Sequence, residues 1–242
     1  MTVLRALALR VLFVIGVMIG AVLAIVIFVM AFRRRARAFH AQGTVCRGEL
    51  TALDDVVGPV LAGSVRVRLS SASHDENSPE PSILGLAMKL GSDQDLPLAS
   101  FESFMKASEA TRTTDVADYL GNQFSSVTPW NVRGLGIVWL RAIPDPAANV
   151  PKTGNRVERL AADIAAGRAA FRLEARGGPG PDGALRARIA ELRLVEKLPA
   201  DDPGFRISML RTGRGLVPTG LRNGIRVIDY PVSQLARRLR GG

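Results

Sequence analysis

Residues 65–70 read Val-Arg-Val-Arg-Leu-Ser, the cleanest alternation of apolar and polar side chains in the sequence. A β-strand has a two-residue period, so the apolar side chains share one face and Arg66, Arg68 and Ser70 share the other. On their own, such polar residues are typical of a solvated sheet face. The stretch therefore predicts a strand with one buried face, and the role of its polar face depends on the rest of the chain.

Other strand-like segments lie on both sides of this one. Segments with apolar or alternating patterns are 43–50, 83–90, 135–140, 171–176 and 185–196. Asn155 and Glu158 form a capping-box pattern that predicts a helix ending near Gly167, and 95–107 and 115–124 are expected to be helix or loop. Many strands without strict β-α-β alternation predict an α+β fold built on an antiparallel barrel or sheet.

An apolar segment precedes this domain. Residues 11–32 contain no charge and no proline, and 22 helical residues reach ~33 Å, enough to cross a bilayer core of ~30 Å. A secretory signal has a shorter apolar run, and here arginines 33–35 follow at once. We expect residues 1–35 to be a retained single transmembrane anchor with a basic juxtamembrane segment, and 36–242 to be one domain.

The charges around the span predict its orientation. More arginines follow the span than precede it, which predicts a soluble domain on the cytoplasmic side of the cell membrane; the margin is small, so the opposite topology stays open. Gly16 and Gly20 form a small-xxx-small pair that lets another helix approach closely. Cys46 is the only cysteine, so no intrachain disulfide forms, and it is expected to be a small apolar strand residue.

The charge of the chain does not indicate a nucleic-acid partner. The formal net charge is +10, but aromatic residues make up 5% of the chain and no basic helix interleaves them. Membrane lipid is the partner that the apolar segment predicts.

Four short motifs follow one another along the domain. They are Arg37-x-x-His40-Ala41-x-Gly43, Val67-Arg68-Leu69-Ser70, Gly85-Leu86-Ala87-Met88-Lys89-Leu90, and Arg226-x-x-x-Tyr230-Pro231 with Arg237 seven residues after the tyrosine. In this order they resemble the haem catalases, and the short chain is similar to the compact catalase-related peroxidases. The resemblance implies a catalase-like antiparallel β-barrel with flanking helices.

The resemblance also implies a haem site. Tyr230 would be the tyrosinate ligand of the iron, and Arg226 would supply the cation that keeps it ionised, since free tyrosine titrates near pH ~10. His40 would move a proton between the oxygens of a bound peroxide, and Ser70 would orient its ring. On the helix that the tail predicts, Arg226, Tyr230 and Arg237 share one face, although Pro231 should open the helix near Asp229 or kink it.

Further residues complete the expected pocket. Arg37, Arg68 and Arg237 would bind the haem propionates, and Phe104 would line the distal side. Ser100 stands near the position where the family has an asparagine that helps to hold peroxide, so Ser100 is the third expected catalytic residue, with His40 and Ser70.

Two functions remain open. The first is a membrane-anchored haem peroxidase that acts on hydrogen peroxide or on lipid or organic hydroperoxides. The second is a non-catalytic membrane protein of the same fold that acts as a binding or scaffold subunit. By analogy with the family, a homo-oligomer or a membrane protein partner is expected.

Overall fold

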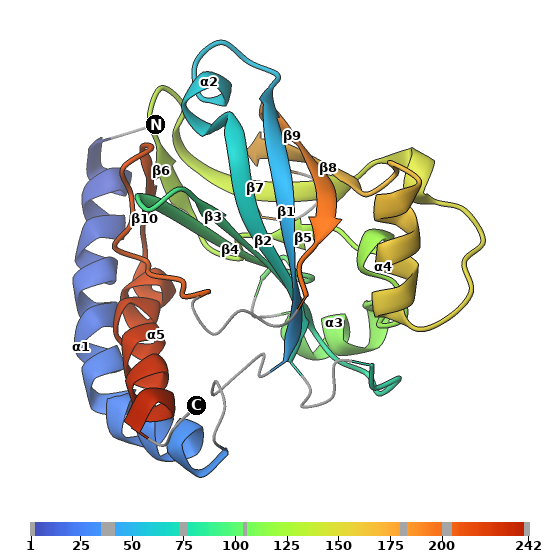
Figure 1. Ribbon diagram of the computed structural model, residues 1–242. Helices are drawn as coiled ribbons and strands as arrows, with labels where there is room; N and C mark the ends of the chain where they lie inside the picture. The colour runs from blue at the N-terminus through green and yellow to red at the C-terminus, as the bar shows by residue number, and fades with distance from the viewer. Residues whose placement is uncertain are drawn as a thin grey trace.

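The computed structural model describes residues 3–34, 42–72, 77–103, 106–179, 183–199 and 205–239. Ten antiparallel strands and five α-helices make up this part of the chain (Figure 1). The strands are β1 (Gly43–Ala52), β2 (Gly63–Ser71), β3 (Leu84–Leu90), β4 (Gln94–Ala99), β5 (Phe124–Ser125), β6 (Trp130–Val132), β7 (Gly136–Pro144), β8 (Ala170–Arg176), β9 (Leu185–Lys197) and β10 (Leu216–Pro218). The helices are α1 (Val3–Arg34), α2 (Gly58–Leu61), α3 (Ala107–Thr113), α4 (Arg156–Ala165) and α5 (Leu221–Leu239).

The sheet closes into an eight-stranded barrel. Its strand order is β7-β5-β4-β3-β2-β1-β9-β8, and pairing of β8 with β7 closes the ring, while β6 and β10 extend the sheet from β7. The α+β class and the antiparallel barrel expected from the sequence are therefore confirmed.

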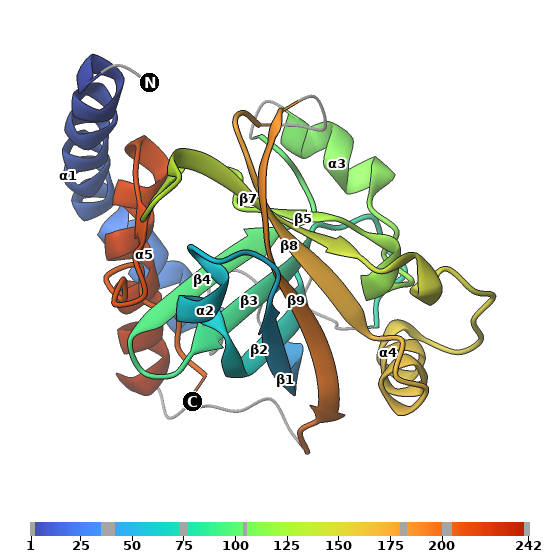
Figure 2. The same ribbon diagram turned by 90° about the horizontal axis from the view of Figure 1, so that it is seen from above.

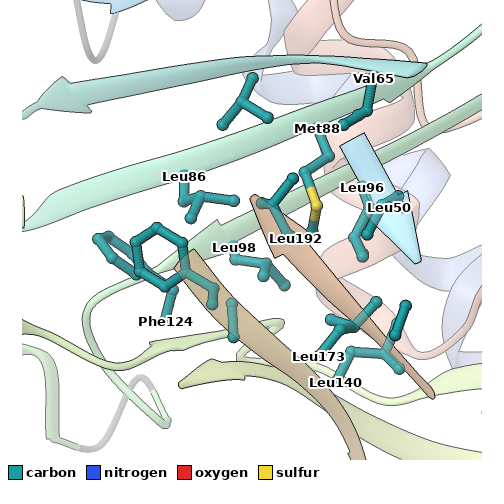
Figure 3. Packing of buried hydrophobic residues seen from close by; sticks show 14 of the residues in the cluster. Leu50, Val65, Leu86, Met88, Leu96, Leu98, Phe124, Leu140, Leu173 and Leu192 are labelled. Atoms are coloured by element: carbon teal, nitrogen blue, oxygen red, sulfur yellow. The ribbon is translucent and has the colours of Figure 1, made fainter. Parts of the chain in front are cut away.

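Apolar side chains fill the inside of the barrel. Val65, Val67 and Leu69 point inward from β2 and belong to the main core, as the alternation predicts. Figure 3 shows part of this core, in which Leu86 and Met88 of β3 point inward among side chains from other strands, such as Leu173 of β8 and Leu192 of β9. Arg66, Arg68 and Ser70 consequently lie on the outer face of β2.

Most of the predicted elements form, and the helix at 155–165 starts as expected. The side-chain oxygen of Asn155 accepts hydrogen bonds from the amides of Val157 and Glu158, and Glu158 accepts one from the amide of Asn155. The prediction of helix or loop from residue 95 is wrong, because 94–99 forms strand β4. All six of its residues are buried, so the pattern of a half-exposed strand is missing there.

The long apolar helix predicted at the N-terminus is α1. It is long and apolar enough to cross a membrane, a property that a signal sequence shares. Figures 1 and 2 both show α1 beside α5 along one flank of the barrel. Of the two outcomes expected at Pro231, a helix that opens near Asp229 is excluded, because α5 begins at Leu221 and continues through Pro231.

Small residues bring α1 and α5 together. A β-carbon built on Gly16 would lie 1.8 Å from the carbonyl oxygen of Leu221, and one on Gly224 would lie 2.1 Å from that of Phe13. One on Gly20 would lie 2.9 Å from the carbonyl oxygen of Ile225. The small-xxx-small pair of α1 therefore contacts a helix of the same chain.

Candidate functional site

The outer face of β2, β3 and β4 carries two cross-strand rows of mostly small residues. In one row Arg68 pairs with Ala87, which pairs with Pro97. In the next row the order is Gly43, Ser70, Gly85 and Ala99. Because paired residues point to the same side of a sheet, these rows form a low, mostly apolar face with a guanidinium and a hydroxyl group on it, and all of its residues except the half-buried Ala87 are buried. We call these two rows the outer-face patch.

Arg68 and Ser70 are not on a solvated face. Their exposed fractions are 5% and 4%. The guanidinium group of Arg68 lies against Gly43, since a β-carbon built there would come within 2.7 Å of Cζ. A β-carbon at this position would also lie 2.6 Å from the carbonyl oxygen of Leu69, so the first residue of β1 has room only for glycine.

A small apolar cluster continues the outer-face patch beyond Ala99. It consists of Ala99, Phe101, Ala110 and Val127, all buried. Val127 has a φ of +64°, a conformation that a β-branched residue rarely adopts. Such strain often occurs at functional sites, and here it lies beside the outer-face patch.

Helix α5 carries the second half of the site. Val227 and Tyr230 pack against the main core of the barrel, so this side of the helix faces the barrel. Arg226 lies one turn before Tyr230, and its Nη1 donates a long hydrogen bond of 3.4 Å to Oδ1 of Asn223. The expected arrangement of Arg226 and Tyr230 on one helix is thus present.

Charged groups crowd the same flank of α5. Arg222, Arg226 and Asp229 follow the i, i+4, i+7 spacing of one helical side, and all three are half-buried. Burial, and then the charge of Arg226, lower the pKa of Arg222. Burial raises the pKa of Asp229, partly offset by Arg226, and among the described residues Oδ1 of Asp229 has no hydrogen-bond partner.

The segment 205–211 connects α5 to the strands that carry the outer-face patch. Arg66 of β2 lies over the ring of Phe205 at 5.8 Å, and Nζ of Lys89 donates to the carbonyl of Arg206. On the other side, Nε2 of Gln234 in α5 donates to the carbonyl of Ile207. The segment therefore lies between α5 and the row next to Arg68.

Asp95 holds this segment to the barrel. Its carboxylate is fully buried and pairs with Lys89 at 3.3 Å and with Arg211 at 3.1 Å. The amide of Ser208 also donates to Oδ2 at 2.7 Å. One buried acid thus joins β4, β3 and the segment 205–211.

Ser100 lies at the edge of a cavity of about 380 Å³, which Phe101, Ser125 and the Arg141–Glu102 ion pair also line. Oγ of Ser100 accepts a hydrogen bond from the amide of Leu84 at 3.0 Å, and it lies 2.9 Å from Oγ1 of Thr114. Ser100 can donate its hydroxyl proton to a peroxide only if Thr114 is the donor in the hydrogen bond between the two hydroxyl groups.

Other predicted site residues are not described by the structure. His40, Arg37 and Phe104 lie outside the described residues, and Arg237 lies in α5 without a described side chain. Their roles stay predictions. Of the expected site, the structure describes the side chains of Arg68, Ser70, Ser100, Arg226 and Tyr230.

Sequence reasoning missed three residues that shape this region: Asp95, Arg222 and Asp229. The helical spacing to Arg226 could have indicated the last two. For Asp95 the only signal was an acid within an apolar strand segment, because its partner Arg211 is 116 residues away.

Comparison with models of known protein families gives no match. Comparison with curated protein sequences gives no match either. Within the ranges that the structure describes, no three His, Cys, Asp or Glu side chains gather into a group that could hold a metal ion. The function must therefore be argued from the outer-face patch and α5.

Proposed function

We propose that this chain is a membrane-associated, catalase-like haem protein with peroxidase activity. Its substrate would be hydrogen peroxide or a lipid or organic hydroperoxide. The observation that carries the proposal is the position of Tyr230. Its ring packs on the barrel one helical turn after Arg226, and segment 205–211 joins its helix to the strands that carry Arg68 and Ser70.

The described residues fit the chemistry of a haem. A planar apolar ring needs a low apolar surface, which Gly85, Ala87 and Ala99 of the outer-face patch would supply if the groups that now bury Gly85 and Ala99 moved aside. Two propionates need cations, and Arg68 is buried beside this surface. Arg222 and Arg226 lie close together on one flank of α5, where an additional negative charge would relieve their repulsion.

The residues would divide the work as follows. Tyr230 would hold the iron, with Arg226 stabilising the phenolate, and Arg68, Arg37 and Arg237 would hold the propionates. Haem bound there would supply the redox chemistry that cleaves the peroxide bond. His40 would take the proton from one peroxide oxygen and give it to the other. Ser70 would fix the orientation of the His40 ring.

The apolar helix favours a substrate that comes from the membrane. His40 lies eight residues after Phe32, so the site is at most ~27 Å along the chain from the end of the apolar run. We propose that a lipid or fatty-acid hydroperoxide enters from the bilayer.

One observation favours the second candidate, a non-catalytic binding or scaffold subunit of the same fold. The hydroxyl group of Ser100, expected to help to hold the peroxide, already has Leu84 and Thr114 as partners. A protein that binds haem without turning over peroxide would keep Tyr230 and Arg68 while leaving Ser100 in this structural role.

An absorption spectrum tests haem binding. The purified full chain should show a Soret band, and Tyr230→Phe should lose it or shift it. Tyr119→Phe is the matched control, because Tyr119 is the only other tyrosine and also lies beside an arginine, Arg156 at 5.8 Å. A chain that stays colourless with added haem, or an unchanged spectrum in Tyr230→Phe, would refute the proposal.

Turnover separates the two candidates. Haem-loaded chain should consume a fatty-acid hydroperoxide, and His40→Ala should reduce the rate by ~100-fold or more while the Soret band remains. If the haem-loaded wild type shows no turnover with any peroxide, the binding or scaffold function is correct. Equal turnover in His40→Ala would remove His40 from the mechanism.

A further inference from the structure

The apolar helix α1 has two different sides. One side carries Gly16, Gly20 and Ala31, which are buried against α5. The opposite side exposes an apolar stripe at helical spacing, in which Val22 and Ile25 are 76% and 75% exposed. The stripe consists of Leu4, Leu7, Val11, Val14, Met18, Val22, Ile25 and Val29.

The two helices run side by side in the same direction over most of α1. The amide of Gly220 donates to the carbonyl of Leu9 at 3.1 Å, near one end of the contact. At the other end Ala31 packs with Ala236. The part of α1 before Leu9 extends past the start of α5 and still contacts the barrel, because the guanidinium group of Arg5 lies 5.9 Å from the ring of Trp139.

This docking conflicts with a crossing of the bilayer by α1. If residues 11–32 crossed, the part of α5 next to Gly16 and Gly20 would lie near the middle of the membrane. That part carries Arg222, Arg226 and Asp229, and the bilayer centre is the most costly position for charged side chains. The edge of the barrel near Trp139 would have to enter the lipid as well.

We infer that α1 lies along the membrane surface rather than across it, with its exposed stripe in the lipid and its glycine side on α5. Residues 11–32 of α1 are apolar all round, so the amphipathic unit that would lie at the boundary between headgroups and acyl chains is the α1–α5 pair, with Arg222, Arg226 and Asp229 of α5 on its polar side. Arg10 and Arg33 are exposed and can reach the headgroups. Leu235 and Leu239 of α5 are also exposed.

This inference concerns lipid and does not depend on haem. The partner is the hydrocarbon of one leaflet, since the stripe is continuous and apolar over 26 residues, ~38 Å of helix. Both ends of α1 would then lie on the same side of the membrane as the barrel. A transmembrane anchor would put them on opposite sides.

Labelling from each side of the membrane tests this arrangement. In full chain carrying Cys46→Ser, one cysteine is introduced either in a short hydrophilic tag before Met1 or by Asp55→Cys on the barrel. A membrane-impermeant maleimide should label both sites in vesicles of the same orientation. If one site is labelled only in right-side-out vesicles and the other only in inside-out vesicles, the inference is overturned. Recovery of the chain in the soluble fraction would also overturn it.

A cross-link tests the docking in the same membranes. A β-carbon built on Gly20 would lie 3.1 Å from Cβ of Ile228, so a slight separation of the two helices brings Gly20→Cys and Ile228→Cys to the ~3.5–4.5 Å Cβ distance at which a disulfide forms. The matched control, Met18→Cys with Ile228→Cys, should not, because Met18 belongs to the exposed stripe. Absence of the Gly20 cross-link in membranes would overturn the inference, as would a cross-linked chain whose tag lies on the far side.

Discussion

Replacing Asp95 by alanine should strongly destabilise the barrel and release the segment that joins it to α5. The Asp95 side chain is fully buried, and Lys89, its partner at 3.3 Å, is only 13% exposed. Removing one member of a buried ion pair costs ~3–5 kcal/mol, because the other charge is left without compensation. Arg211 is 36% exposed and can turn to water, so we expect the lower end, ~3 kcal/mol.

Asp93→Ala is the matched control for this prediction. Asp93 also pairs with an arginine of the C-terminal part, Arg214 at 3.2 Å, but the Asp93 side chain is 51% exposed. Exposed pairs contribute ~0.2–1 kcal/mol, so this variant should lose at most ~1 kcal/mol. Asp95→Asn should fall between the two, because it keeps an oxygen for the Ser208 amide but loses the charge.

Thermal unfolding of the full chain in detergent measures the difference. Trp130 is buried next to β7, so tryptophan fluorescence reports the loss of barrel packing. A loss of ~3 kcal/mol corresponds to a fall in Tm of ~6–12 °C for a chain of this size. Equal falls for Asp93→Ala and Asp95→Ala would refute the reasoning, since it depends on the burial of Asp95 and on the partners that Asp95 leaves without compensation.

Two further variants test α5. Asp229→Asn should raise the free energy of unfolding at a pH above the raised folded-state pKa of Asp229, because the wild type must ionise a buried carboxyl group there. This gain in stability should vanish below the unfolded pKa near 3.8, where the carboxyl group is protonated in both states. Urea unfolding at pH 3.5 and pH 8 measures the gain, and a gain at pH 3.5 alone would contradict the prediction. Gly224→Ala places a β-carbon 2.1 Å from the Phe13 carbonyl and should cost ~1–3 kcal/mol in thermal unfolding, whereas Gly178→Ala, whose β-carbon meets nothing closer than 3.7 Å, should stay within ~0.5 kcal/mol.

The fold could be predicted wherever one side of an element is buried. Residues 65–70 alternate because their apolar side chains fill the barrel, and Asn155 with Glu158 caps a helix through local hydrogen bonds. β4 could not be recognised in this way, because both of its faces are covered. Its polar residue Asp95 is satisfied by an arginine far along the chain, and such a partner is not visible in a local pattern.

The candidate site shows the same division. The sequence predicts that Arg68 and Ser70 share one strand face and that Arg226 and Tyr230 share one helix side, since both follow from element periodicity. The burial of Arg68, the crowding of Arg222 with Arg226, and the segment 205–211 between α5 and β2 depend on tertiary packing. The docking of α1 on α5 is of this second kind, because nothing near Gly16 indicates which helix it meets.

Helix α5 connects the proposed site to the proposed lipid surface. One side of it packs on the barrel through Val227 and Tyr230, and nearly the opposite side packs on α1 through Gly224 and Ala236. An α-helix with its side chains is ~10–12 Å across, so Tyr230 lies within about two helix widths of the exposed stripe of α1. The proposed site and the proposed lipid surface are therefore separated only by the α1–α5 pair, so a substitution in their contact should affect both haem binding and membrane binding if both proposals hold.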